Sequence, residues 1–292
     1  MEASTTGRLA RPGFIRGAGG VELFYRDWGA GRPVVFVASW SLPSDSWGYQ
    51  MLALVEAGYR AIAFDRRGHG RSLDPGRGYD VDTLADDIAA VLDALDLREA
   101  VLVGHSMGCN EILRYLSRHG GARVAGAALL GTMTPFALKT GDNPDGIEAA
   151  FFDDFQAQLM RDFPQWIDDN MVPFVYPETA PGMKSWVRQM ALGASLHALV
   201  ECHRALVHTD LRRELARIDV PVLLIAGDAD ASAPLELTAR PTAGLLPNAR
   251  LRVYEGAPHG MFITHMAEVN RELLEFADGI AQNRRQRETE AG

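Results

Sequence analysis

The fold is decided by the stretch from Val101 to Gly108, which reads Val-Leu-Val-Gly-His-Ser-Met-Gly. Its first three residues are apolar, as in a strand buried on both faces of a sheet, and helical periodicity follows over 107–118. The Gly-x-Ser-x-Gly between them predicts a turn so sharp that side chains at positions 104 and 108 would collide with neighbouring backbone. Such a turn holds the hydroxyl of Ser106 above the sheet edge, at the positive end of a helix, where an oxyanion is stabilised.

Short apolar runs and helical patterns alternate on both sides of this stretch. In the first run apolar and polar residues alternate, as in an exposed antiparallel strand, whereas several later runs are apolar throughout. Alternation of strands and helices predicts an α/β fold with a parallel sheet and helices on both faces. The predicted strands are 21–25, 34–38, 61–64, 101–103, 124–130, 222–226 and 251–254, and the predicted helices are 46–57, 81–95, 107–118 and 266–277.

The alternation stops once, between about residues 136 and 218. That range holds only helical segments separated by prolines, and ~80 residues are too many for an ordinary connection. We therefore expect a helical insertion at 136–216 in a core formed by 13–135 and 217–282, with flexible segments at 1–12 and 283–292. Some apolar side chains of the insertion should line a substrate pocket, because helices that cover a sheet bury the face that they turn towards it.

Composition excludes several classes of protein. The chain has 292 residues, 47% of them hydrophobic and 23% charged, which is typical of a globular protein. Its net charge of −9 disfavours binding to nucleic acid. No apolar stretch reaches the ~18–20 residues that span a bilayer, and the N-terminus lacks the apolar segment of a signal peptide. We expect a cytoplasmic protein without a membrane partner, and the sequence leaves open whether it forms a homo-oligomer.

The cysteines and histidines do not predict a metal site. Two cysteines cannot build a disulfide framework, and no second pair with metal-ligand spacing exists. His197, His203 and His208 share a helical stretch, but spacings of six and five residues do not align them on one face.

A serine nucleophile needs a base and a carboxylate that orients the base. In a strand–turn–helix site of this kind, the chain order is serine, acid, histidine. The run 222–226 leads into a loop with Asp228 and Asp230, and the run 251–254 leads into a loop with His259. Of the eight histidines, His259 is the one in a Gly- and Pro-rich loop after a predicted strand, where sites of open α/β sheets collect. Position after the strand leaves the choice between the two aspartates open.

In these motifs the chain resembles the α/β-hydrolase superfamily and, within it, the cofactor-free haloperoxidase and esterase group. The further matching motifs are Phe-Asp-Arg-Arg-Gly-His-Gly-Arg-Ser at 64–72 and Gly-Ala-Pro-His-Gly at 256–260. The resemblance covers about residues 14–135 and 217–280. It implies a mostly parallel eight-stranded sheet flanked by helices, with a helical cap at 136–216. The family pattern Gly-x-x-Asp-x-x-x-Pro implies Asp230 as the acid, with Asp228 as the alternative.

The resemblance also implies an oxyanion hole, and here the chain departs from the family. The family's third strand usually ends in His-Gly and an apolar residue, whereas this chain reads Ala38-Ser39-Trp40. By position, the two donors are the backbone N–H groups of Trp40 and Met107. The hydroxyl of Ser39 supplies a third donor, fills space that a substrate would use, or reflects a local repacking. The candidate pocket residues are Ser39, Ser41, Trp47 and Phe136, and a core role for Trp47 is an equal alternative.

These features predict a serine hydrolase that cleaves carboxylic esters of small molecules through an acyl-enzyme. Its catalytic residues would be Ser106, Asp230 and His259, with no metal or organic cofactor implied. The same residues would also serve a perhydrolase or haloperoxidase, a lactonase, or a hydrolase of C–C bonds. An alternative of a different class is a receptor or lyase that keeps the fold without hydrolysis.

Overall fold

One mixed sheet organises the protein, whose computed structural model describes residues 13–291. Within these residues eight strands are hydrogen-bonded in the order β1-β2-β4-β3-β5-β6-β7-β8. The strands β1 and β2 run antiparallel to their neighbours, and the pairs from β4 to β8 are parallel. The predicted fold class is confirmed. The strands are β1 Phe14–Arg16, β2 Glu22–Gly29, β3 Pro33–Val37, β4 Arg60–Phe64, β5 Ala100–His105, β6 Val124–Leu130, β7 Val222–Gly227 and β8 Ala249–Tyr254.

Helices cover both faces of the sheet because alternate residues of each buried strand point to opposite sides. In β3, Phe36 packs in a cluster with α1 and α10, whereas Val35 packs in a cluster with α2 and α3. Both side chains are fully buried, which explains why the central strands are apolar throughout. These helices are α1 Gly48–Glu56, α2 Val81–Ala94, α3 Met107–His119 and α10 Met266–Ala291.

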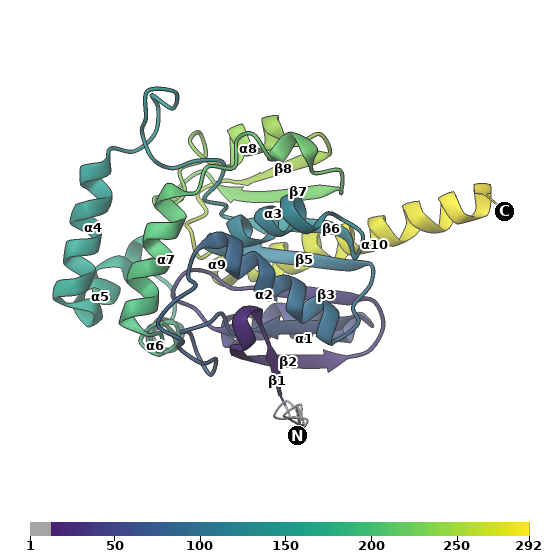
Figure 1. Cartoon of the computed structure of the whole chain (residues 1–292), viewed down its shortest axis with the longest axis horizontal. Helices are drawn as coiled ribbons and strands as arrows, with labels where there is room; N and C mark the ends of the chain where they lie inside the picture. Colours follow the sequence, from purple (N-terminus) through teal and green to yellow (C-terminus); the bar gives the residue numbers. More distant parts are fainter. Residues whose placement is uncertain (1–12, 292) are drawn as a thin grey trace, which may run out of the picture.

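Four α-helices lie between β6 and β7, within the range expected for the insertion. Figure 1 shows them together on one side of the molecule, away from the free end of α10. Each of them contributes buried side chains to the apolar cluster that contains Phe36 and Trp47. They include Leu159, Ile167, Val187 and Leu199. The four helices therefore share a core with the sheet. They are α4 Ala149–Arg161, α5 Phe163–Phe174, α6 Pro181–Ala191 and α7 Leu196–His208.

The structure contains short elements that the sequence pattern does not predict. These are β1, α8 (Ala239–Leu245) and α9 (Met261–Thr264). A strand of three residues is too short to show a period, and α8 includes Pro241 and Gly244, which disfavour helix. The predicted helix at 266–277 continues as α10 to Ala291. The sequence pattern does not predict this extension, because the last turns are polar and carry no hydrophobic period.

The segment 1–12, predicted to be flexible, lies outside the described residues, as do the side chains of 283–292. Of the helices described, none combines the length and apolar character that a membrane span requires.

Candidate active site

Ser106 occupies a strained turn between β5 and α3. Its backbone has φ 55° and ψ −119°, a conformation that L side chains rarely adopt. A Cβ on Gly108 would lie 2.4 Å from the carbonyl oxygen of Val37, and one on Gly104 would lie 2.9 Å from the backbone carbonyl carbon of Gly108. The collisions predicted from the sequence are therefore present. Because neither glycine has a side chain, α3 begins directly against the end of β3.

The loops after β7 and β8 bring an aspartate to a histidine. Nδ1 of His259 is 2.7 Å from Oδ2 of Asp230, and both side chains are buried. The other oxygen of Asp230 accepts hydrogen bonds from the backbone N–H groups of Ser232 and Ala233, at 2.9 and 2.7 Å. The carboxylate is therefore held on both oxygens. Asp228 instead accepts a hydrogen bond from the backbone N–H of Gly256, so of the two aspartates left open, Asp230 contacts His259.

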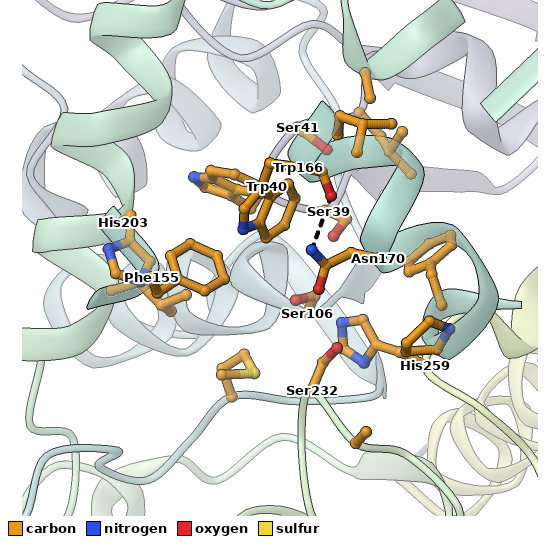
Figure 2. A pocket seen from close by; sticks show the side chains of 18 of the residues that line it. Ser39, Trp40, Ser41, Ser106, Phe155, Trp166, Asn170, His203, Ser232 and His259 are labelled. Atoms are coloured by element: carbon orange, nitrogen blue, oxygen red, sulfur yellow. Dashed lines mark hydrogen bonds between the residues drawn. The ribbon is translucent and has the colours of Figure 1, made fainter. Parts of the chain in front are cut away.

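Ser106 and His259 line the same cavity, and Figure 2 shows the hydroxyl and the imidazole facing the same part of it. Because Nδ1 of His259 is bonded to Asp230, Nε2 is the ring atom left for Ser106. No hydrogen bond joins the Ser106 hydroxyl to His259 among the residues described.

His105, the last residue of β5, holds the backbone of His259 in place, a role that the sequence analysis missed. Its Nε2 donates a hydrogen bond to the carbonyl oxygen of His259 at 2.9 Å, and the two ring centroids are 4.7 Å apart. Burial, with a contribution from nearby His259, holds the pKa of His105 well below its usual range. The ring is therefore uncharged, and it fixes the His259 backbone without adding a competing charge.

Arg66 holds the end of β3 in place. Its guanidinium donates to the carbonyl oxygens of Ala38 and Ser39, at 2.6 and 3.0 Å, and to Glu111 of α3 at 2.7 Å. Arg66 and Glu111 are both fully buried. In a trans peptide the N–H points opposite to the C=O, so the bond to Ser39 turns the N–H of Trp40 away from Arg66.

The second predicted donor lies on α3. Met107 is the first residue of that helix, so its N–H has no partner within the helix. The backbone N–H groups of Trp40 and Met107 thus both stay available at the end of β3 and the start of α3.

A cavity of about 390 Å³ opens above Ser106. It lies under α4, α5, α6 and α7 and is lined mainly by apolar and aromatic side chains. No Asp, Glu, Lys or Arg is among its lining residues in the part of the chain that the structure describes. Its polar side chains other than Ser106 and His259 are Ser39, Ser41, Asn170, His203 and Ser232.

Two of the four predicted pocket residues, Ser39 and Ser41, line this cavity, and the other two do not. Trp47 is a core residue, because the turn before α1 points its ring inward against Phe36 and Phe262, at centroid distances of 5.0 and 5.3 Å. Phe136 instead lies beneath the guanidinium of Arg212, 5.0 Å from the ring centroid.

The lining residues of the cap were not found from the sequence. They include Phe155 of α4, Asn170 of α5 and His203 of α7. Asn170 donates to the carbonyl oxygen of Trp166 at 2.8 Å, the bond drawn in Figure 2. Helical periodicity shows that a segment has an apolar face but not which other element that face meets.

No group of three or more His, Cys, Asp or Glu residues within the described part of the chain is arranged to hold a metal ion.

Residues 34–272 match the alpha/beta hydrolase family. A non-heme chloroperoxidase from Kitasatospora aureofaciens is 42% identical over 264 residues, which cover 88% of this chain and 96% of that protein. A bifunctional esterase/perhydrolase from Acinetobacter calcoaceticus is 39% identical over 273 residues, covering 90% of this chain and 99% of that protein. The solved structure of an esterase from Exiguobacterium antarcticum has a TM-score of 0.88 at 31% identity, over 91% of this chain and 98% of that chain.

Replacement of Arg66 by Met should destabilise the protein, because it leaves the carboxylate of Glu111 buried without a partner. We expect the free energy of unfolding to fall by about 3–5 kcal/mol in urea denaturation. The double variant Arg66→Met with Glu111→Leu removes both charges and should recover most of the loss. If the double variant is no more stable than the single one, the buried charge is not the cause.

Stability should also depend on pH through His203. Burial lowers the pKa of His203 from 6.5 to about 4, and the positive charges of Arg204 and His208 act in the same direction. Between these values the unfolded chain binds a proton that the folded protein does not, so stability falls as the pH falls from 6.5 towards 4. From pH 7 to pH 5 the wild type should lose about 1–2 kcal/mol more than the variant His203→Phe. Urea denaturation at both pH values measures this difference, and equal losses would contradict it.

Proposed function

Because this chain belongs to the alpha/beta hydrolase family, we propose that it hydrolyses carboxylic esters through an acyl-enzyme formed on Ser106. The resemblance inferred from the motifs is confirmed by these relatives. One observation carries the proposal on ester cleavage. Nδ1 of His259 is hydrogen-bonded to a buried carboxylate at 2.7 Å, and the imidazole lines the cavity into which the strained turn directs the Ser106 hydroxyl.

In the acylation step, Oγ of Ser106 attacks the acyl carbon of the ester while Nε2 of His259 takes the hydroxyl proton. The negative charge that develops on the carbonyl oxygen is stabilised by the backbone N–H groups of Trp40 and Met107. Asp230 keeps the imidazole in the tautomer with the proton on Nδ1 and stabilises the imidazolium. The imidazolium then gives its Nε2 proton to the leaving alcohol, and the C–O bond breaks.

In the deacylation step, a water molecule takes the place of the alcohol. His259 removes a proton from this water as it attacks the acyl carbon, and the same two N–H groups hold the second oxyanion. Collapse of this intermediate releases the carboxylic acid and returns the proton to Ser106.

The cavity supports small-molecule esters with apolar groups as substrates. Pockets of about 300–1,000 Å³ take ligands of drug-like size, and a lining without ionic side chains disfavours a charged substrate group.

The proposal is tested by labelling the protein with a fluorophosphonate and locating the adduct by mass spectrometry. We expect modification at Ser106 and hydrolysis of p-nitrophenyl acetate, both abolished in Ser106→Ala. An adduct at another residue, or none, would contradict the proposal. A ligand response that persists in Ser106→Ala would indicate a receptor or lyase instead.

The choice of acid has a matched control in the neighbouring aspartate. Asp230→Asn should lower kcat by about 10⁴-fold, because an amide favours the wrong tautomer of His259. Asp228→Asn should keep most of the activity, since Asp228 accepts a hydrogen bond from the backbone of the His259 loop, whereas the imidazole is bonded to Asp230. Equal losses in the two variants, measured with p-nitrophenyl acetate, would exclude Asp230 as the orienting acid.

Perhydrolysis is a second candidate, favoured by the names of the chloroperoxidase and the esterase/perhydrolase. In this reaction a neutral carboxylic acid such as acetic acid acylates Ser106 with loss of water. Hydrogen peroxide then replaces water in deacylation, and the acyl group leaves as a peracid. The peracid then oxidises bromide to hypobromous acid and is itself reduced to the carboxylic acid.

Bromination of monochlorodimedone with peroxide, bromide and acetate should therefore be detectable and should be lost in Ser106→Ala. Its rate is compared with that of p-nitrophenyl acetate hydrolysis. A much larger bromination rate would make perhydrolysis the main activity, and bromination that survives in Ser106→Ala would exclude the acyl-enzyme as its source.

A further inference from the structure

Five aromatic side chains form one wall of the cavity, which we call the aromatic subsite. Trp40 comes from the end of β3, and the other four come from the cap. The ring centroids of Phe155 and Trp166 are 4.8 Å apart, and Trp40 lies 5.4 Å from Trp166, both in edge-to-face contact. The subsite consists of Trp40, Phe152, Phe155, Trp166 and His203.

His203 is the polar member of this subsite. Its imidazole stacks on the ring of Phe155, with centroids 4.4 Å apart and an interplanar angle of 9°. The residue is only 7% exposed, and neither of its ring nitrogens has a hydrogen bond to any residue that the structure describes. His203 lines the cavity, so its ring nitrogens are open to a partner that enters there, and a ligand hydroxyl can take the place of water on them.

The proposed mechanism does not use His203. In Figure 2 the His203 and Phe155 rings lie on the opposite side of the cavity from His259, with Ser106 between them. Trp40 connects the two sides: its backbone N–H belongs to the proposed oxyanion hole, and its indole contacts Phe155 and His203 at centroid distances of 5.9 and 6.5 Å.

The chemistry of the subsite selects the partner. An uncharged imidazole offers one N–H donor and one nitrogen acceptor, which matches a hydroxyl group that both donates and accepts. The surrounding rings favour an aromatic ring in stacked or edge-to-face contact. Since no ionic side chain lines the cavity within the described residues, a carboxylate or an ammonium group would be buried there without a counter-charge.

We propose that the aromatic subsite binds an aryl group with a neutral hydroxyl, such as a phenol, and that His203 is the specificity-determining residue that hydrogen-bonds this hydroxyl. The proposal rests on the proposed function only in naming the ligand as part of an ester substrate. The natural substrates would then be esters with a hydroxylated aromatic ring in the acyl or alcohol part.

Binding is measured first, with Ser106→Ala protein and two neutral probes, 4-propylphenol and propylbenzene. Quenching of tryptophan fluorescence reports occupancy, because Trp40 and Trp166 belong to the subsite. One uncharged hydrogen bond should make the phenol bind about 3- to 10-fold more tightly than propylbenzene. The variant His203→Phe in the same background keeps an aromatic ring but no hydrogen-bonding atom, and should abolish the preference.

Two further variants complete the design. His197→Phe changes an exposed histidine of the same helix that does not line the cavity, and it should keep the preference. His203→Gln restores a donor and an acceptor and should recover part of it. Equal affinity of the Ser106→Ala protein for the two probes would by itself overturn the proposal. A preference for the phenol that persists in His203→Phe would also overturn it.

Hydrolysis is measured second, with methyl 3-(4-hydroxyphenyl)propanoate and methyl 3-phenylpropanoate. We expect kcat/KM to favour the hydroxylated ester by a similar factor, mainly through KM, and the ratio to fall to about one in His203→Phe. A phenol preference in binding without hydrolysis of either ester would refute the proposed function and leave the subsite supported. Hydrolysis of both esters with equal kcat/KM and equal probe affinity would refute the subsite alone.

Discussion

The structure of the site depends on the close approach of α3 to the end of β3. At Gly108 the carbonyl oxygen of Val37 occupies the space that a Cβ would need. This contact requires the strained backbone of Ser106, and it places the first N–H of α3 next to the end of β3. It also brings Glu111 within reach of Arg66, whose guanidinium holds two carbonyl oxygens of the β3 end. A turn that costs conformational energy is thus held by packing and by a buried ion pair.

Asp230 and His259 meet because of the order of the strands in the sheet. The strands β7 and β8 are parallel neighbours, so the loops at their carboxyl ends lie side by side. At Gly227 the carbonyl oxygen of Ala257 lies 2.0 Å from the position that a Cβ would take, which shows how closely the two loops pack. Asp230 and His259 therefore reach each other although they are 29 positions apart in the sequence.

The cap and the sheet contribute different parts of the site, although both pack into a shared apolar cluster. The sheet side supplies Ser106, His259 and the backbone N–H groups of the proposed oxyanion hole, whereas the cap supplies most of the cavity walls and all but one member of the proposed aromatic subsite. A cavity without ionic side chains strengthens hydrogen bonds inside it, and it makes an unpartnered imidazole such as that of His203 costly unless a ligand or water pairs with it. Specificity is therefore expected to vary with the cap while the chemistry stays with the sheet.

The sequence alone determined the parts of the protein that depend on local geometry. The Gly-x-Ser-x-Gly turn, the buried strands and the histidine loop are recognisable because steric limits and side-chain period act between residues close in the chain. Tertiary structure decided the rest. It brought Asp230 rather than Asp228 to His259, assigned Trp47 to the core instead of the pocket, and gave His105 and His203 their places. These outcomes depend on contacts between segments that are distant in the chain. The sequence does not predict them, because such contacts leave no periodic pattern in it.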